Sequence, residues 1–568
     1  MPQNIVIIGA VALGPKAACR FKRLEPESSV TMVDQGTLIS YGGCGIPYYI
    51  SGDVNDPGQL QATSFNMLRD DKFFRNAKDI RVMTGTRAVA IDRRTKEVHI
   101  IDLASREEGI LPYDKLVLAT GSIPRSLPVT GSDLEGTFTI SNLDNAIAVR
   151  EMIAGGEVEK ALVIGSGAVG LEMAEAISDL WGIETTVVEI ADQILPGVVS
   201  QNMARMAQHH IEENGITFYL SEKVEQIEGE KRVERVITDK RVIEADLVIM
   251  AVGVEPNSEL AREAGLKLSS SGGIVVNRML QSSDPDIYSG GDCVEITNLI
   301  TGRPGYYPLG SIANRQGRVI GSNLAGGTAE FAGAVGSFVI KLFDTSIASA
   351  GLNIEAARRE GFDAISAFIV QFDRSHFYPE KDLISLELVV ERQTRRVLGI
   401  QGFGNKGEGT VRRIDAVAAI LKYRPTTEDI SNLEIAYSPP FSAAMDILNA
   451  LGNTAENILE GKNRVMDVDE FSELWQERKN DGLFFLDCRG HSNAKPFVER
   501  YPFLWYNIPQ DELRTRIDEI PGDKRILLIC NTGVRSYEAQ VTLDQMGITD
   551  SVNIQGGMAG LKQWGLDI

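Results

Sequence analysis

The chain has 568 residues, several times the usual domain size of roughly 150 residues, so three or four domains are expected. Hydrophobic residues make up 43% of the chain and charged residues 24%, which is typical of globular proteins and excludes a mainly disordered chain. The 57 Lys and Arg residues against 78 Asp and Glu leave a formal net charge of −21, and no dense basic block occurs. This charge argues against nucleic acid as a partner.

No stretch approaches the roughly 18 uninterrupted apolar residues of a membrane span, and the first apolar run, Ile5 to Ile8, lacks the pattern of a signal peptide. The sequence therefore predicts a soluble, cytoplasmic protein with no membrane contact. Five cysteines are too few and too scattered for a disulfide framework, and none forms a CxxC pair. The five histidines include only one adjacent pair, His209 and His210, so no metal site is expected.

The N-terminus is predicted to fold as a strand, a tight turn, a helix and a second strand. The turn, Gly9-Ala10-Val11-Ala12-Leu13-Gly14, follows the first strand, and the second strand ends at Asp34. Glycines permit a tight turn, and the helix that follows offers free N–H groups to a pyrophosphate. Asp34 follows Gly14 by 20 residues, the spacing of an acid that binds ribose hydroxyls. Val11 replaces the central glycine, so a plain packing turn is the alternative here.

The same order recurs with a complete glycine turn. The strand 161–164 leads into Gly165-Ser166-Gly167-Ala168-Val169-Gly170, and Glu189 ends the next strand 19 residues after Gly170. Two copies of this pattern predict two dinucleotide sites.

Three later segments fit the same plan. The runs 116–122 and 247–253 are predicted to be buried strands that end in small residues, where the backbone can approach a cofactor. The small residues are Ala119, Thr120, Gly121 and Gly253. A further strand ends at Asp292, whose carboxylate could accept hydrogen bonds from a sugar-like chain. Taken alone, each segment could equally be sheet core or an ordinary turn.

The pattern of predicted strands and helices changes at about residue 326. Strands at 337–342 and 384–390 and a helix near 411–422 predict a separate α+β domain, and residues 451–463 are predicted to be a linker. Strands at 483–486 and 526–529, with helices between them, predict a small α/β domain from about residue 464 to the end.

The first 450 or so residues resemble the flavin- and pyridine-nucleotide-dependent disulfide reductases, most closely the coenzyme A-disulfide reductase branch. The segment that carries this resemblance is Ser40-Tyr41-Gly42-Gly43-Cys44-Gly45-Ile46-Pro47-Tyr48, which looks like that branch's single-cysteine active-site signature. The resemblance implies that FAD binds at residues 9–14, 119–121 and Asp292, and that NAD(P)H binds at residues 165–170.

Further residues match positions of that family. Tyr437, in Tyr437-Ser438-Pro439-Pro440-Phe441, and Tyr378 resemble tyrosines that reach the cysteine of the other subunit, which implies an obligate homodimer. Arg20, Lys22 and Arg23 stand where the family has a basic cluster for coenzyme A phosphates, although a solvated helix face is an equally good interpretation. Ser40 is a further candidate for substrate binding.

The last domain resembles rhodanese. Cys530-Asn531-Thr532-Gly533-Val534-Arg535-Ser536 fits the CxxGxR loop of that family, in which backbone N–H groups surround the cysteine sulfur. With Arg535 nearby, such a loop should stabilise a thiolate or a persulfide. Cys488 stands where that family usually has a core valine, and we interpret it as a core residue.

The resemblances imply an α/β protein with two Rossmann-like dinucleotide-binding domains, an α+β dimerisation domain and a C-terminal rhodanese α/β domain. The expected boundaries are 1–112 with 250–325 for FAD, 113–249 for NAD(P)H, 326–450 for dimerisation, 451–463 for the linker and 464–568 for rhodanese.

A flavin between a nicotinamide and one cysteine suggests that NAD(P)H reduces a sulfur species at Cys44. The cysteine must be a thiolate to attack sulfur, and a nearby flavin and backbone dipoles could lower its pKa. A small-molecule persulfide, a polysulfide or coenzyme A disulfide is the expected substrate, and Glu189 favours NADH over NADPH because a carboxylate repels the 2′-phosphate. The alternatives are an NADH oxidase or peroxidase that cycles Cys44 through sulfenic acid, or a non-turnover sensor that binds a sulfur carrier.

Overall fold

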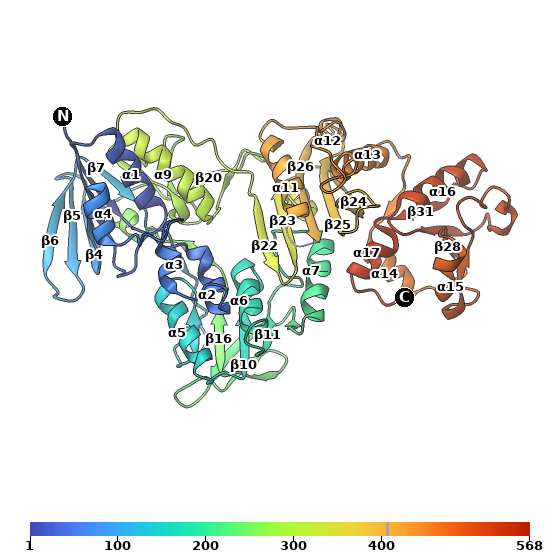
Figure 1. The fold of residues 1–568 in the computed structure, drawn as a ribbon, viewed down its shortest axis with the longest axis horizontal. Coiled ribbons are helices and arrows are strands. Elements are labelled where there is room, and N and C mark those ends of the chain that lie inside the picture. The colour runs from blue at the N-terminus through green and yellow to red at the C-terminus, as the bar shows by residue number, and fades with distance from the viewer. Residues whose placement is uncertain (405–407) are drawn as a thin grey trace. The chain divides into compact units, whose positions relative to one another are not determined.

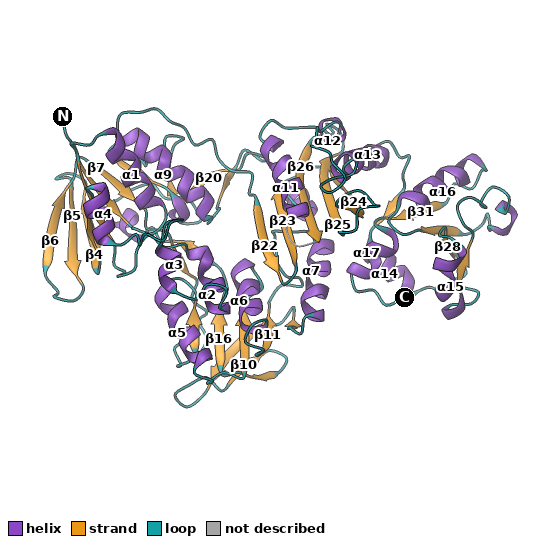
Figure 2. Cartoon of the chain, in the orientation of Figure 1, coloured by secondary structure: helices purple, strands orange, loops and turns teal. Residues whose placement is uncertain are grey.

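The computed structural model describes residues 1–404 and 408–568, which form two compact units that each mix helices and strands (Figure 2). The first unit comprises residues 1–192 and 216–334, and the second comprises residues 193–215 and 335–568. Among the described residues, no helix combines the length and apolar character needed to cross a membrane.

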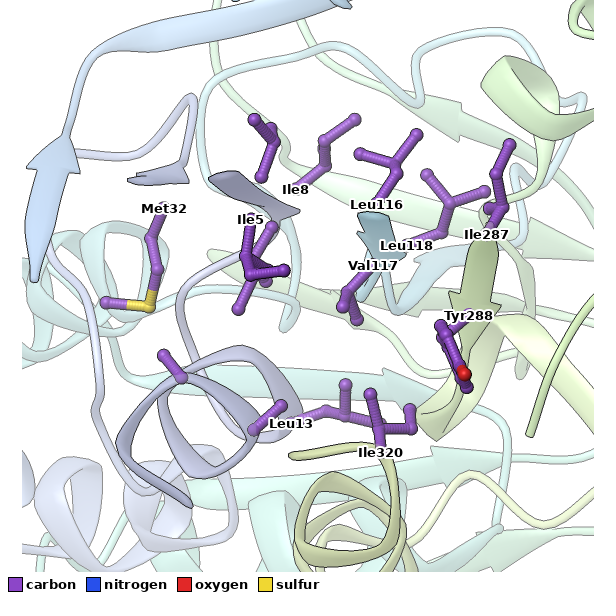
Figure 3. Packing of buried hydrophobic residues seen from close by; sticks show 14 of the residues in the cluster. Ile5, Ile8, Leu13, Met32, Leu116, Val117, Leu118, Ile287, Tyr288 and Ile320 are labelled. Atoms are coloured by element: carbon purple, nitrogen blue, oxygen red, sulfur yellow. The ribbon is translucent and has the colours of Figure 1, made fainter. Parts of the chain in front are cut away.

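The first unit is built on a parallel sheet with the strand order β19-β7-β1-β2-β3. In that order the strands are Ile287–Ser289, Lys115–Leu118, Asn4–Ile8, Ser29–Val33 and Arg81–Met83. Helices α1 (Leu13–Leu24) and α9 (Gly310–Leu324) lie side by side on one face (Figure 1). Figure 3 shows Ile5 and Val117 on the side of the sheet that faces Leu13 and Ile320, with Leu116 and Leu118 on the other. Both faces are buried, which explains why these strands are apolar throughout.

A second parallel sheet in this unit has the order β12-β11-β10-β16-β9. In that order the strands are Thr217–Tyr219, Glu184–Val188, Lys160–Ile164, Leu247–Met250 and Thr137–Thr139. Helix α6 (Ala168–Ser178) follows β10 as α1 follows β1, so the two sheets repeat one plan. Two antiparallel sheets accompany them, β4-β5-β6 (Thr86–Asp92, Glu97–Asp102, Glu108–Pro112) and β13-β14-β15 (Val224–Glu228, Arg235–Thr238, Val242–Glu244).

Two expected boundaries differ from the structure. Strand β7 pairs with β1 in the first sheet, although the second domain was expected to begin at residue 113. Helix α7 (Gln201–Glu213) groups with the second unit, where it packs on β26, although it falls inside the expected NAD(P)H domain. A short buried strand and an amphipathic helix carry no pattern that identifies the sheet they join.

The second unit contains an antiparallel sheet with the order β22-β23-β26-β25-β24. In that order the strands are Phe338–Leu342, Thr345–Gly351, Val397–Gly404, Leu383–Glu391 and Ala364–Phe372. Helices α11 (Glu408–Leu421) and α13 (Ile447–Leu459) pack on it. Leu451 and Ala455 of α13 are fully buried, so most of the expected linker 451–463 is a packed helix. The apolar face of this helix packs on the sheet, which explains the difference.

The last sheet is parallel, with the order β27-β31-β30-β28-β29. In that order the strands are Val465–Met466, Ser551–Ile554, Arg525–Ile529, Leu483–Asp487 and Trp505–Asn507. Its helices are α14 (Val468–Gln476), α15 (His491–Arg500), α16 (Val534–Gln545) and α17 (Gly557–Gln563). Two hydrogen bonds join segments after β31 to the antiparallel sheet. The Phe368 backbone N–H donates to Gln555 Oε1 at 2.7 Å, and Ser385 Oγ donates to Gln563 Oε1 at 2.5 Å.

Shorter elements complete the fold. The remaining helices are α2 (Ile46–Ser51), α3 (Pro57–Gln61), α4 (Asp71–Lys78), α5 (Leu143–Ala154), α8 (Glu259–Glu263), α10 (Ile354–Arg359) and α12 (Thr427–Ser431). The remaining strands are β8 (Ser122–Pro124), β17 (Val254–Pro256), β18 (Ile274–Val275), β20 (Val294–Thr297) and β21 (Pro304–Gly305). Three short 3-10 helices span Gly43–Gly45, Gly291–Cys293 and Ile517–Glu519.

A buried ion pair holds the segment before α13. Arg413 Nη2 lies 2.6 Å from Asp446 Oδ2, and both side chains are 1% exposed. Replacing Asp446 with Ala leaves the guanidinium buried without its carboxylate, which should lower the free energy of unfolding of the second unit by about 3–5 kcal/mol. Urea unfolding measures the change.

The matched control is Glu259→Ala, which removes an exposed ion pair with Arg262. Its effect should stay within about 0.5 kcal/mol. Equal losses in the two variants would show that the buried pair contributes nothing beyond a surface contact.

Candidate functional site

The first glycine turn lies where β1, β2 and β7 end. A Cβ atom on Gly14 would lie 1.9 Å from the carbonyl oxygen of Gly9, so only glycine lets α1 begin this close to β1. The turn continues through Val11 and Ala12, which are half-buried. Asp34 accepts hydrogen bonds from the backbone N–H groups of Ala10, at 2.7 Å, and Gly36, at 2.8 Å. Burial raises the pKa of Asp34, and these two donors lower it. Its carboxylate thus holds the turn in shape.

The second turn has the same construction. A Cβ atom on Gly170 would lie 2.0 Å from the carbonyl oxygen of Gly165, whereas one on Gly167 would meet nothing within 4 Å. Glu189 is buried, and its oxygens accept bonds from Ser166 N at 2.7 Å, Ser166 Oγ at 2.9 Å and Ala191 N at 2.9 Å. The open side of Gly167, next to the first residue of α6, fits a pyrophosphate group.

Polar groups that suit a flavin cofactor gather near β7 and α9. Ser122 Oγ donates to Asp292 Oδ2 at 3.2 Å, and Gln316 Oε1 accepts from the Gly291 backbone at 2.6 Å. Gln316 Nε2 is buried and finds no hydrogen-bond partner within the described residues. A Cβ atom on Gly121 would meet nothing within 4 Å. An unpaired buried donor beside open backbone fits a cofactor with polar oxygen atoms, such as FAD.

The other small residues of the expected cofactor segments have structural partners. The Ala119 backbone N–H donates to Ile8 O at 2.8 Å, and Thr120 Oγ1 donates to Asn257 O at 2.5 Å. Gly253 O accepts from Arg125 N at 3.0 Å. These bonds fix the chain between the two nucleotide-type sheets of the first unit.

Cys44 lies in the short helix before α2 and is exposed. A Cβ atom on Gly310, the first residue of α9, would lie 3.8 Å from its Sγ. Burial raises the pKa of the Cys44 thiol, and the carboxylates of Glu172 and Asp292 raise it further, while its own backbone N–H lowers it. The backbone thus lowers this pKa as expected, but desolvation and two carboxylates outweigh it, so the pKa is raised.

Glu172, on α6, is a site residue that the sequence analysis missed. Burial raises its pKa to about 7, with a further contribution from Glu175. Its position two residues after Gly170, on the helix of the second turn, was the only available signal. A carboxyl group with a pKa of about 7 whose charge acts on a cysteine thiol can exchange protons near neutral pH.

The four expected substrate residues lie in two places: Ser40 contacts the first turn, and Arg20, Lys22 and Arg23 lie on α1. Ser40 is buried with φ +52°, and its N–H donates to Ala10 O at 2.8 Å, so it links the Cys44 segment to the first turn. Lys22 Nζ donates to Pro26 O and Ser28 O and pairs with Asp79 at 2.6 Å, so internal contacts account for it. Arg20 Nε donates to Ser322 Oγ at 3.0 Å, and Arg23 is exposed.

Tyr378 and Tyr437 lie in two segments of the second unit that contact each other. Ser375 N donates to Pro439 O at 3.3 Å, and Ser375 Oγ donates to Ser442 O at 3.2 Å. Tyr437 is 52% exposed and Tyr378 is half-buried. Phe377 and Phe441 of the same segments are also exposed. An apolar surface of this kind suits an interface between protein chains.

Cys530 follows β30 and opens the turn before α16. Its Sγ accepts a hydrogen bond from the Gly533 N–H at 3.1 Å and lies 3.2 Å from Ser536 Oγ, whose hydroxyl donates to Asn553 Oδ1 at 2.7 Å. Gly533 has φ +97°, which lets its N–H turn inward, and Arg535 is half-buried on the first turn of α16. Cys488 is 1% exposed, which confirms its interpretation as a core residue.

Comparison with known proteins identifies the family. Residues 3–317, more than half of the chain, match the family model described as pyridine nucleotide-disulphide oxidoreductase. The chain belongs to this family. Residues 338–448 match the dimerisation domain of the pyridine nucleotide-disulphide oxidoreductases, and residues 454–563 match the rhodanese-like domain. The expected family and fold class are confirmed.

Similar proteins extend over nearly the whole chain. The NAD(P)H sulfur oxidoreductase (CoA-dependent) of Pyrococcus abyssi is 35% identical over 449 residues, which are 79% of this chain and 97% of that protein. The structure of an NAD-dependent persulfide reductase from A. fulgidus has a TM-score of 0.92 and 38% identity, covering 98% of this chain and 99% of that one. Reduced CoADR-RHD from Bacillus anthracis has a TM-score of 0.90 and 30% identity, covering 99% and 98%.

Two glycines of the second turn, Gly167 and Gly170, give a matched pair of variants in this oxidoreductase. Gly167→Ala places a methyl group in open space, so the thermal stability should not fall while the Kd for NADH rises about tenfold or more. Gly170→Ala drives a methyl group into the Gly165 carbonyl and should destabilise the unit. Melting curves and NADH titrations measure both. Unchanged NADH binding in Gly167→Ala would remove this turn from the nucleotide site.

The acidic surroundings of Cys44 give a second prediction. Glu172→Gln removes a negative charge that raises the Cys44 pKa, so alkylation of Cys44 by iodoacetamide should become faster. Since Glu172 itself ionises with a pKa of about 7, the difference should appear above that pH and vanish below it. Mass spectrometry of the Cys44 peptide gives the rates. Glu151→Gln, at an exposed position of α5, is the control and should leave them unchanged.

Proposed function

We propose that this oxidoreductase uses NAD(P)H, through bound FAD, to reduce the sulfane sulfur of persulfides or polysulfides, or coenzyme A disulfide, at Cys44. The observation that carries the proposal is one exposed cysteine in a unit with two nucleotide-type turns, joined in one chain to a rhodanese-like loop that keeps its cysteine. The names of the relatives from P. abyssi and A. fulgidus describe such sulfur chemistry for those proteins.

The residues that would hold the cofactors are those of the two turns. Gly9 to Gly14, Ala119 to Gly121 and Asp292 would bind FAD, and the second turn with Gly253 would bind the nicotinamide nucleotide. FAD, when bound, supplies two-electron transfer between NAD(P)H and sulfur. Glu189 supports NADH, with NADPH possible, because its buried carboxylate would repel a 2′-phosphate.

Cys44 would act as the nucleophile. Its thiolate attacks the carbon-bound sulfur of a persulfide, HS⁻ leaves, and a mixed disulfide with Cys44 forms for reduction. The motif has no second cysteine, so the other thiol comes from the substrate. The charge of Glu172 acts on the Cys44 thiol, and the Glu172 carboxylate can take up the proton that this thiol loses when the thiol ionises.

The rhodanese-like loop would bring sulfur in. The Gly533 N–H that donates to Cys530 Sγ stabilises negative charge on that sulfur, which suits a persulfide whose outer sulfur passes to a small thiol such as coenzyme A. Arg20 and Arg23 are the remaining candidates for coenzyme A phosphates.

The assembly is the last part of the proposal. The dimerisation-domain match and the exposed aromatic residues beside Tyr378 and Tyr437 support a homodimer in which these tyrosines reach the partner's cysteine. The cytoplasmic location remains a prediction from the sequence.

Anaerobic NADH oxidation with sulfide counted is the experiment that tests the function. Fast turnover with about one sulfide per NADH on coenzyme A persulfide, glutathione persulfide or polysulfide is the expected result. Turnover only after oxygen is admitted would favour the NADH oxidase instead. Stable binding of a sulfur carrier without turnover would favour the sensor.

Two cysteine variants separate the two units. Cys44→Ser should abolish sulfide release that depends on NADH, while flavin reduction by NADH continues. Cys530→Ser should keep disulfide reduction near normal and slow only the reactions that use sulfane sulfur. A Cys44→Ser protein that still releases NADH-dependent sulfide at the normal rate would show that Cys44 is not the redox cysteine.

A further inference from the structure

Two buried cysteines lie at the ends of neighbouring strands in the rhodanese-like domain. Strands β28 and β30 pair in parallel, with Asp487 opposite Ile529. The Cys488 N–H then donates to Ile529 O at 2.8 Å. This bond continues the ladder by one residue, so Cys488 lies opposite Cys530.

Both side chains lie on the same face of the sheet. Leu486 and Leu528 are paired one step earlier, and side chains two residues apart share a face. Cys488 packs in an apolar cluster with Leu486, Leu528 and residues of α16, and Cys530 Sγ lies 3.2 Å from Ser536 Oγ of the same helix. The two sulfur atoms therefore lie between this sheet and α16.

The spacing of the strands suits a disulfide. Neighbouring strands lie about 4.8 Å apart, and the Cα atoms of a disulfide are usually about 4.4–6.8 Å apart. Burial raises the pKa of the Cys488 thiol well above its usual value, and the charge of Cys530 raises it further.

We propose that Cys488 is a second reactive thiol of this domain, which attacks the Cys530 persulfide and releases sulfide. The inference rests on the proposed function of Cys530 as a sulfur acceptor. The Cys488 sulfur bonds to Cys530 Sγ, and the bond between Sγ and the outer sulfur breaks. The outer sulfur takes the electron pair of that bond and the Cys488 proton, and it leaves as hydrogen sulfide. The sulfane sulfur is reduced, and the two cysteines are oxidised to a disulfide.

Burial favours this internal reaction over attack from outside. Cys530 is 1% exposed, so a bulky thiol has little access to its inner sulfur, whereas Cys488 ends the neighbouring strand of the same sheet. The reaction needs neither NADH nor Cys44. Two molecules of a thiol small enough to reach the site restore both cysteines and become a disulfide.

The test uses the full-length holoprotein with Cys44→Ser as background, so that sulfide from the flavin centre is absent. The protein is loaded with inorganic polysulfide, desalted and incubated without NADH or thiol. Loading is measured as the gain of one sulfur on the Cys530 peptide. Released sulfide and the disulfide-linked peptides of Cys488 and Cys530 are then followed by mass spectrometry without reduction.

The expected result is one sulfide per loaded chain together with the disulfide. Adding Cys488→Val, an apolar side chain for this apolar position, should leave loading intact, abolish the disulfide and slow sulfide release about tenfold or more. Cys488→Ala is the second variant if valine disturbs the core. Cys19→Ala, far along the chain on α1, is the matched control and should behave like the background protein.

Each other outcome overturns the inference. Loading with equal sulfide release in the Cys488→Val protein, or loading without the linked peptides, removes the role of Cys488 and leaves the proposed function intact. Failure of Cys530 to load in any of these proteins overturns both the inference and the sulfur-accepting function of the loop.

Discussion

A hydrogen bond from the backbone of a glycine turn to a strand-end carboxylate is the constraint on which the first unit depends. The Ala10 N–H donates to Asp34, and the Ser166 N–H donates to Glu189, so each turn is closed from the neighbouring strand. The Ser40 N–H in turn donates to Ala10 O, and this places the segment of Cys44. One pattern of acid and glycine thus positions both the proposed cofactor sites and the proposed nucleophile.

The two cysteines proposed to react occupy different surroundings. Cys44 is exposed, and the carboxylates of Glu172 and Asp292 raise its pKa. Cys530 is buried, and its sulfur accepts a hydrogen bond from the Gly533 N–H. The first cysteine is therefore open to solvent, whereas the second is enclosed by its own loop.

The sequence could predict the elements that depend on local chemistry. Both glycine turns, their acids and the loop of Cys530 have fixed residue types at fixed spacing, and the structure places each at a strand end. The effect of Glu172 on Cys44 and the proposed role of Cys488 could not be predicted, because both depend on neighbours that are distant in the sequence. The role of α13 was missed because a helix with one apolar stripe and a linker with polar ends look alike until the sheet it covers is known.

The packing of α13 has a consequence for how sulfur travels. The rhodanese-like domain is joined to the antiparallel sheet by a buried helix and by the bonds of Phe368 to Gln555 and of Ser385 to Gln563. Such an attachment is not a flexible linker. A flexible linker would raise the local concentration of the carried sulfur at a distant acceptor. In the proposed function the domain therefore accepts sulfur at a fixed position, and the concentration of free carrier thiol, more than the motion of the chain, should set the flux of sulfur away from Cys530.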